Sequence, residues 1–420
     1  MGTPGQRNNR ALPNAGPAIY DVAHSPVLPQ AGEAVVVTAK VSDPDGVESL
    51  SVRYRVDASN ITVTPALFTS LNMVDNGTNG TGGDAIAGDG IYSATIPAQP
   101  AGNIVTFYVQ AADSLGATNL FPQDVFPPSG LDRVFPNDAP TRECVVRWGE
   151  VQMPGSFATY HLWLSYATLN RWAFRGRPTT ADGGLNNAEL DGTFVYNNSR
   201  VVYNSLPLYA GSPWHRGQMN SGPAGAQRVD YVQNFPPDDR LLGTTDFVFN
   251  NPGNPGGTST SDTSGQTEQT SYIMFNEIGL VYNHRRYVHH FVNGSQRSTT
   301  TGRTGNFIFE DSQQPNGDMV AEWFPDDTEG DLYKIEDWFE FPDDGFNFSS
   351  NNDADLTRRT ITLGGQPTMV IAPYRFMFRK RSVGPGDNTA DYTNFFNLVD
   401  AVSPAANPSA ATVDAAAMKR

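Results

Sequence analysis

The sequence predicts a β-rich α+β fold, in which a β-sandwich precedes a larger unit with a mixed or antiparallel sheet and few helices. Glycine and proline are abundant, with 40 Gly and 31 Pro in 420 residues, as in proteins built from short strands and turns. Short alternating, β-branched segments recur between residues 34 and 113, which favours a sandwich. Two later segments, residues 266–280 and 391–400, have the character of helices.

Composition restricts the classes of function. The formal net charge of −16 disfavours nucleic acid as a partner, because the phosphate backbone would repel the chain. The acidic balance suits solubility outside the cell or the binding of divalent cations. A single cysteine, Cys144, excludes an intramolecular disulfide and a Cys-based zinc site, and the alternation around it predicts a buried strand residue. No run of about 18 apolar residues occurs, so we expect no insertion into a membrane.

The first part of the chain is predicted to be a flexible leader followed by the sandwich. Residues 1–19 are rich in Gly, Pro and Asn, and they lack the basic region and apolar core of a signal peptide. The chain is therefore expected to be a mature form or a segment of a longer protein. Residues 20–120 contain the strands that predict the sandwich, namely residues 34–41, 50–56, 91–97 and 105–113.

A proline-rich segment is expected to join the sandwich to the larger unit. Five prolines fall within residues 121–140, which predicts a stiff linker. Residues 141–400 form the larger unit, and an Ala- and Pro-rich tail occupies residues 401–420. Strands are predicted at residues 193–196 and 200–203.

The clearest helix of the larger unit is predicted to end at a glycine cap. Residues 266–279 have no internal proline, and Gly279 stands where a C-terminal cap belongs. Residues 287–292 alternate like a strand, and Asn293-Gly294 predicts a hairpin turn. We expect the helix to pack on a sheet that contains residues 287–292 and 306–310.

Three carboxylates lie in one glycine-rich loop, at Asp75, Asp84 and Asp89. Hard cations such as Ca²⁺ prefer several oxygen ligands on a flexible backbone, so these residues are candidate calcium ligands. Their spacing does not match an EF-hand loop, and Asp-Gly pairs also form turns without a metal. Both interpretations stay open at this point.

Other patterns indicate structural roles. His289 and His290 would point to opposite faces of a strand, so they are not expected to share one metal ion. The chain has no Gly-x-Ser-x-Gly, His-Glu-x-x-His or Walker motif. Trp163, Trp172 and Trp214 would suit a carbohydrate surface if they were exposed, but core positions are the commoner use of tryptophan.

One lysine stands among carboxylates. Residues 326–337 contain six further acids around Lys334. Such a lysine is either a phosphate contact with a tuned environment or part of an ion-paired surface.

Five segments of the larger unit resemble the CotH spore-coat kinase family, in the order in which the family has them. The family has a strand, a D-x-x-L-x-G loop and a second strand, then a helix ending in Gly-Leu, an R-x-V hairpin ending in Asn-Gly, a strand with an acidic end and a G-N-L-Y-K segment. The matching residues are 238–250, 268–280, 286–294, 305–311 and 330–334.

The resemblance implies an atypical, ATP-dependent protein kinase that uses Mg²⁺ and acts on coat or envelope proteins. It makes Lys334, Glu268 and Glu310 candidate nucleotide-binding residues, with Glu268 facing Lys334, and it leaves the catalytic residues unknown. Two departures put activity in doubt. Residues 227–235 lack the family's lysine, and neither an N-x-D loop nor a W-D-x-D segment follows before Arg420. The catalytic lobe is therefore expected to be incomplete in this chain.

Residues 87–97 are similar to the Ig-like modules that precede CotH domains in large exported bacterial proteins. The resemblance implies an extracellular or cell-surface location. Other surface or coat proteins, or further copies of this chain, are the implied partners. The alternative is a non-catalytic structural or adhesive protein that uses both domains as a scaffold.

Overall fold

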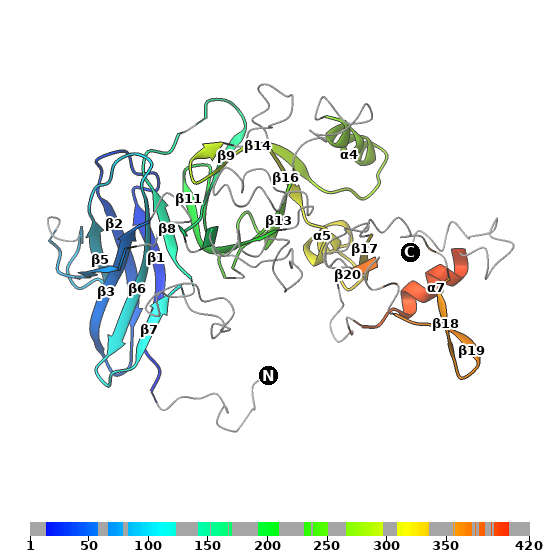
Figure 1. Ribbon diagram of the computed structural model, residues 1–420, viewed down its shortest axis with the longest axis horizontal. Coiled ribbons are helices and arrows are strands. Elements are labelled where there is room, and N and C mark those ends of the chain that lie inside the picture. Colours follow the sequence, from blue (N-terminus) through cyan, green and yellow to red (C-terminus); the bar gives the residue numbers. More distant parts are fainter. Residues whose placement is uncertain are drawn as a thin grey trace. The chain divides into compact units, whose positions relative to one another are not determined.

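Figure 1 shows a computed structural model of the protein. The chain forms two compact units. The first unit contains residues 1–177, 187–268 and 286–311, and the second contains residues 178–186, 269–285 and 312–420. The described residues are 14–57, 66–78, 83–122, 142–151, 153–166, 168–169, 192–209, 231–236, 238–250, 266–296, 309–335, 356, 358–371, 374, 378–382, 388 and 390–402.

The first unit begins with a sandwich of two sheets. The three-stranded sheet has the order β1-β2-β5, and in the other sheet β4, β3, β6 and β7 follow one another while β8 also pairs with β6. The strands are β1 (Ala18–Ser25), β2 (Val35–Ser42), β3 (Val47–Val56), β4 (Thr69–Asn72), β5 (Ile91–Ile96), β6 (Ile104–Asp113), β7 (Thr118–Phe121) and β8 (Cys144–Arg147).

Alternating side chains from both sheets form the core of the sandwich. Val35, Val37 and Ala39 of β2 are fully buried, and they pack in one cluster with Val52 of β3 and Val105 of β6. This is the period-two pattern that predicted the strands, because successive side chains of a strand point to opposite faces. Several inward-facing side chains are β-branched, and such residues favour strand conformation.

The sandwich extends beyond the residues expected to form it. At its start, a Cβ on Gly16 would lie 2.6 Å from the carbonyl carbon of Thr118, and Asn119 Nδ2 donates to the Pro17 carbonyl oxygen at 3.1 Å. The segment from residue 14 is thus packed on β7 and is not part of a flexible leader. At its end, β8 pairs with β6, and Cys144 is buried as predicted. Residues 123–141, most of the expected linker, lie outside the described part of the chain.

The second part of the first unit is a sheet that closes on itself. Its order is β15-β14-β16-β13-β12-β11-β10-β9, and β14 also pairs with β9 in parallel, from Val288 opposite Ala158 to Val292 opposite Leu162. The strands are β9 (Ala158–Trp163), β10 (Gly192–Tyr196), β11 (Arg200–Tyr209), β12 (Tyr231–Asn234), β13 (Asp246–Asn250), β14 (Arg285–Val292), β15 (Ser295–Gln296) and β16 (Phe309–Gln313).

Aromatic and aliphatic side chains fill the inside of the closed sheet. Tyr160, Phe194, Phe249 and Phe309 are fully buried in one cluster, and Phe249 lies 5.9 Å from Tyr160 and 5.6 Å from Phe309 between ring centroids. Ring pairs at such distances in tilted or edge-on arrangements stabilise a core beyond the area that they bury.

Buried residues join the closed sheet to the sandwich within the first unit. Trp163, Val195 and Tyr203 belong to the same buried cluster as the sandwich core. The backbone N–H of Val145 donates to Thr193 Oγ1 at 2.8 Å, and Tyr203 hydrogen-bonds to His24. Strands β9, β10 and β11 of the closed sheet therefore contribute side chains to the sandwich core, which is distinct from the cluster inside the closed sheet.

The predicted hairpin between β14 and β15 is confirmed. Asn293 and Gly294 have φ values of +48° and +76°, as a two-residue turn of this kind requires. The side chain of Asn293 is buried and forms hydrogen bonds with both the N–H and the carbonyl oxygen of Leu164. Its Oδ1 accepts from Leu164 N at 2.8 Å, and its Nδ2 donates to Leu164 O at 2.9 Å.

The second unit has a small core around α7 (Thr393–Val402). Phe395 and Val399, four residues apart on one face of this helix, are buried together with Tyr374, Phe378 and Tyr392. The other elements are α5 (Gly317–Trp323), the paired strands β17 (Leu332–Ile335) and β20 (Phe378–Ser382), and the paired strands β18 (Thr360–Leu363) and β19 (Gln366–Met369).

The helix α4 (Thr267–Glu277) ends at Gly279 as predicted. Gly279 has φ +72°, its N–H donates to Asn276 O at 3.1 Å, and Leu280 N donates to Phe275 O at 2.9 Å, which is the Schellman pattern. None of its residues is buried. Residues 269–277 of the helix belong to the second unit and residues 287–292 to the first, so the packing of this helix on that sheet stays a prediction.

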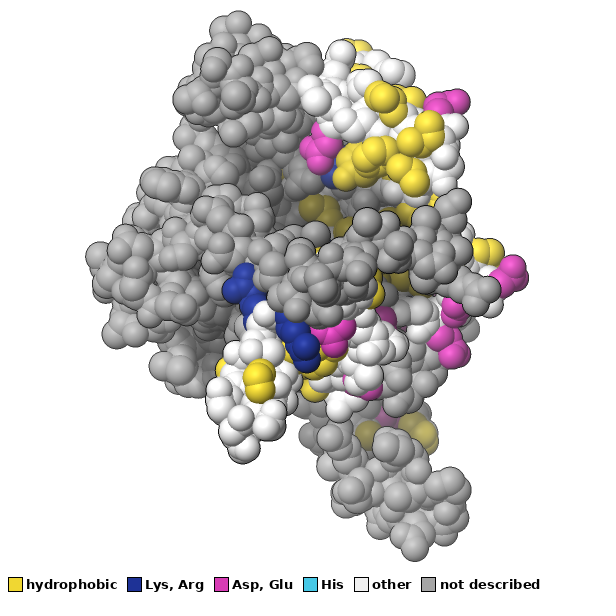
Figure 2. All heavy atoms as spheres, turned by 90° about the vertical axis from the view of Figure 1, so that its right-hand side faces the viewer, with side chains coloured by type: hydrophobic (Ala, Val, Ile, Leu, Met, Phe, Trp, Pro, Cys, Tyr) yellow, Lys and Arg dark blue, Asp and Glu magenta, His cyan; other side chains and the backbone are white. Residues whose placement is uncertain are grey.

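The apolar side chains of α4 are exposed. Ile273, Met274 and Phe275 are consecutive, so at about 100° per residue they spread around the helix and form no single apolar face. Ile273 is 60% exposed and Met274 is 61% exposed. Figure 2 shows hydrophobic side chains gathered at the top of the face on which α4 lies.

The β-rich α+β class is confirmed by the mixed and antiparallel sheets and the few helices of the described residues. Among those residues, no helix has the length and apolar character needed to cross a bilayer.

Candidate functional site

The loop between β4 and β5 brings together the three carboxylates that the sequence singled out. One oxygen each of Asp75, Asp84 and Asp89 lies within 4.8 Å of the others. Asp75 accepts from the N–H groups of Gly88 and Gly90, at 2.6 and 2.9 Å.

The other two carboxylates of this loop also accept hydrogen bonds from backbone N–H groups. Asp84 accepts from Gly77 N and from Ile86 N, and Asp89 accepts from Ile91 N at 2.9 Å. The hydrogen bond from Gly77 is the largest cause of a pKa of Asp84 below its usual value. The group has the oxygen atoms that a hard cation prefers, but hydrogen bonds within the loop already satisfy both oxygens of Asp75 and of Asp84.

The candidate nucleotide-binding residues are divided between the two units. Glu310 is fully buried on β16, and Glu268 is exposed in the first turn of α4; both belong to the first unit. Lys334 is half-buried on β17 in the second unit, opposite Arg379 of β20. Glu268 and Lys334 belong to different units, so the expected approach of Glu268 to Lys334 stays a prediction.

Beside Lys334, the second unit contains a lysine that the sequence patterns did not single out. Lys380 of β20 is almost completely buried, and its Nζ lies 2.7 Å from Asp331 Oδ1. Tyr333 donates to the other oxygen of Asp331 at 3.2 Å, and burial is the largest cause that raises the pKa of Tyr333. Lys380, which lies 46 residues after Lys334 in the sequence, is thus held by an ion pair with Asp331.

A buried tyrosine and a buried aspartate meet a partly exposed arginine on strands β9, β16 and β14 of the closed sheet. Asp311 Oδ2 accepts from Tyr160 OH at 2.5 Å and from Arg286 Nε at 2.8 Å. The side chain of Arg286 is 43% exposed whereas that of Asp311 is 4% exposed. Burial raises the pKa of Asp311 although Arg286 opposes it, and burial also raises the pKa of Tyr160.

This cluster holds one positive charge in a fixed position. The guanidinium of Arg286 lies 5.9 Å from the ring centroid of Tyr160 and 5.8 Å from that of Phe247, within the range of cation–π contacts. Tyr160 and Asp311 are 151 residues apart, so sequence spacing offered no sign of the cluster.

His289, His290 and Trp163 are all buried. His289 and His290 are 9% and 0% exposed, and the ring of His290 stacks on Phe249 at 5.0 Å. Trp163 is buried, and its Nε1 donates to Glu150 Oε1 at 2.8 Å, which favours the core interpretation over a carbohydrate surface. Trp172 and Trp214 lie outside the described residues.

No protein-family model matches the chain, and no curated protein matches it significantly.

Proposed function

We propose that this chain belongs to an extracellular or cell-surface bacterial protein of the CotH type, and that it serves as a structural or adhesive scaffold. One observation carries the proposal. The described parts of the five CotH-like segments take the elements that the resemblance implies, in the same order. These are the turn and strand up to β13, the helix α4, the hairpin of β14 and β15, the strand β16 and the strand β17.

The geometry of the candidate nucleotide-binding residues favours a scaffold over a kinase. Phosphoryl transfer requires a lysine at the phosphates, carboxylates on Mg²⁺ and a positioned base. Glu310 has no exposed surface, so it would have to leave the closed sheet to approach a nucleotide.

Protein partners fit the scaffold role. Other surface or coat proteins, or further copies of the chain, are the partners that we propose. The exposed apolar side chains of α4 support contacts with protein, because such side chains gain stability when a partner removes them from water (Figure 2).

The proposal is tested with radiolabelled ATP and Mg²⁺ or Mn²⁺, with the protein itself as the phosphate acceptor. We expect no label on the wild-type chain. Lys334→Ala is the informative variant, and Lys40→Ala is its control, because Lys40 forms an exposed ion pair with Asp21 in the sandwich. Labelling that Lys334→Ala abolishes and Lys40→Ala preserves would refute the scaffold proposal.

The kinase remains the second candidate, and the Lys380–Asp331 pair favours it. Kinases hold their phosphate-binding lysine with a carboxylate, and this pair lies beside the CotH-like segment of residues 330–334. Binding of ATP, measured by calorimetry, is expected to depend on Lys380 if the second unit takes a nucleotide. Equal heats for wild type and Lys380→Ala would remove the support that this pair gives to the kinase.

A further inference from the structure

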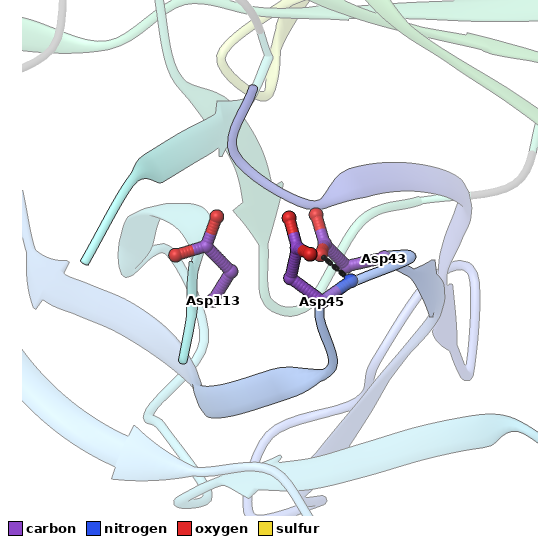
Figure 3. A group of neighbouring side chains, drawn as sticks. All are labelled: Asp43, Asp45 and Asp113. Atoms are coloured by element: carbon purple, nitrogen blue, oxygen red, sulfur yellow. Dashed lines mark hydrogen bonds between the residues drawn. The ribbon is translucent and has the colours of Figure 1, made fainter. Parts of the chain in front are cut away.

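Two turns meet at one end of the sandwich, and each carries aspartate. The turn between β2 and β3 contains Asp43 and Asp45, and β6 ends at Asp113 just before the turn to β7 (Figure 3). Ser114 ties the two turns together. Its N–H donates to Gly46 O at 3.2 Å, and its Oγ donates to Asp45 O at 2.6 Å.

The three carboxylates converge at a spacing that suits one metal ion. One oxygen each of Asp43, Asp45 and Asp113 lies within 4.8 Å of the other two. Ca²⁺ accepts about six to eight oxygen ligands in a flexible arrangement, whereas Mg²⁺ demands a near-ideal octahedron and usually keeps several waters. Carboxylates that come from two separate turns therefore suit Ca²⁺ better than Mg²⁺.

Asp113 points to a ligand independently of the clustering. It is 2% exposed, and its Oδ1 accepts from Leu115 N at 2.9 Å and from Ala117 N at 2.8 Å. Its Oδ2 is buried and has no hydrogen-bond partner. Buried carboxylate oxygens normally have a partner, because an unsatisfied one destabilises the fold.

The surroundings of Asp113 favour its ionised form. Burial would raise the pKa of Asp113, but hydrogen bonds from the N–H groups of Ala117 and Leu115 and the neighbouring amide of Asn14 together hold it below its usual value. Oδ1 of Asn14 is also buried without a hydrogen-bond partner. The side chain of Asn14 therefore lies beside the carboxylate of Asp113.

Positively charged side chains do not neutralise this group. In the described part of the chain, no lysine or arginine forms an ion pair with Asp43, Asp45 or Asp113. The contrast with Asp75 and Asp84 is direct, because backbone N–H groups bind both oxygens of each of those residues.

We propose that Asp43, Asp45 and Asp113 bind one calcium ion, which fastens the turn between β2 and β3 to the turn between β6 and β7. The remaining positions of the ion are filled by water. Dissociation constants near 10⁻⁴–10⁻³ M are usual for calcium sites of extracellular modules, so the binding is expected in that range.

The experiment is a calorimetric titration of the chelator-treated full chain with CaCl₂, repeated with MgCl₂. Asp45→Asn removes one charge where the side chain makes no hydrogen bond to a described residue, so the fold should be preserved. Asp113→Asn keeps the Oδ1 acceptor for Leu115 and Ala117. Each variant should weaken calcium binding at least tenfold, because calcium affinity follows the number of charged ligands.

Asp89→Asn in the other acidic loop is the matched control, since it also removes one charge and keeps the acceptor for Ile91 N. It should bind calcium like the wild type. The proposal is overturned if the wild type binds no calcium at about 10 mM, if Mg²⁺ binds more tightly than Ca²⁺, or if Asp89→Asn loses the binding that Asp45→Asn and Asp113→Asn retain. Circular dichroism of each variant checks that the sandwich is folded.

Discussion

Replacement of His24 by glutamine should remove much of the acid sensitivity of the first unit. His24 is buried at the start of the sandwich, and its Nε2–H donates to the Val27 carbonyl oxygen at 3.1 Å. A carbonyl oxygen only accepts, so Nε2 carries the proton, and Nδ1 of the neutral ring accepts from Tyr203 OH. A second proton on the ring would make Nδ1 a donor and break this arrangement.

The magnitude follows from the effect of burial on the ring. Burial lowers the pKa of His24 from 6.5 to about 4. The unfolded chain therefore takes up a proton on His24 below about pH 6.5, whereas the folded chain does so only near pH 4. Stability is unaffected by this residue above pH 6.5 and falls by about 3 kcal/mol as the pH decreases to 4.

The assay is urea denaturation at pH 7.0, 5.5 and 4.0, followed by tryptophan fluorescence. The free energy of unfolding should decrease more steeply with acid in the wild type than in His24→Gln. From pH 7.0 to pH 4.0 the wild type should lose about 3 kcal/mol more than the variant. His284→Gln is the control, because His284 is exposed in the second unit and binds Glu322 there. Parallel curves for wild type and His24→Gln would refute the reasoning.

Three further outcomes are expected. Asn293→Ala should lower the free energy of unfolding by about 2–4 kcal/mol, since it strains a residue at φ +48° and leaves two buried backbone groups of Leu164 unpaired. Asn293→Gly should lower it less, because glycine adopts a positive φ without strain. Equal urea midpoints for the two variants would contradict this. Tyr160→Phe should cost about 1–2 kcal/mol, because Asp311 keeps Arg286 as a partner; the same titration measures it, and an unchanged midpoint would argue against the hydrogen bond. A proteolytic cut within residues 121–140 should leave both pieces together on a sizing column, because β8 stays paired with β6, and separation of the pieces would count against that pairing.

The local signals in the sequence predicted local structure well. The β-branched alternation of residues 34–41 became β2, and Gly279 and Asn293-Gly294 mark the cap and the turn that their residue types indicate. Such features depend on a few neighbouring residues, so they can be inferred from the sequence alone. The short helix α5 was missed although Asn316 caps it, because seven residues give too little periodicity.

Contacts between distant residues were not predictable in this way. Asp75, Asp84 and Asp89 share one loop, and one oxygen of each lies near the others. Asp45 and Asp113 are 68 residues apart, and only the pairing of β3 with β6 brings their turns together. The same holds for Lys380 and Asp331, which become neighbours because β20 pairs with β17.

Closure of the second sheet has a consequence for biosynthesis. The parallel pairing of β14 with β9 joins Val288 to Ala158, which lie 130 residues apart in the chain. At about 5–20 residues per second, a ribosome would need roughly 7–26 seconds between these two points. During that interval β9 exposes the edge that β14 later covers, and an unpaired edge recruits strands from other chains. The growing chain would therefore benefit from a chaperone that holds β9 until the ring can close.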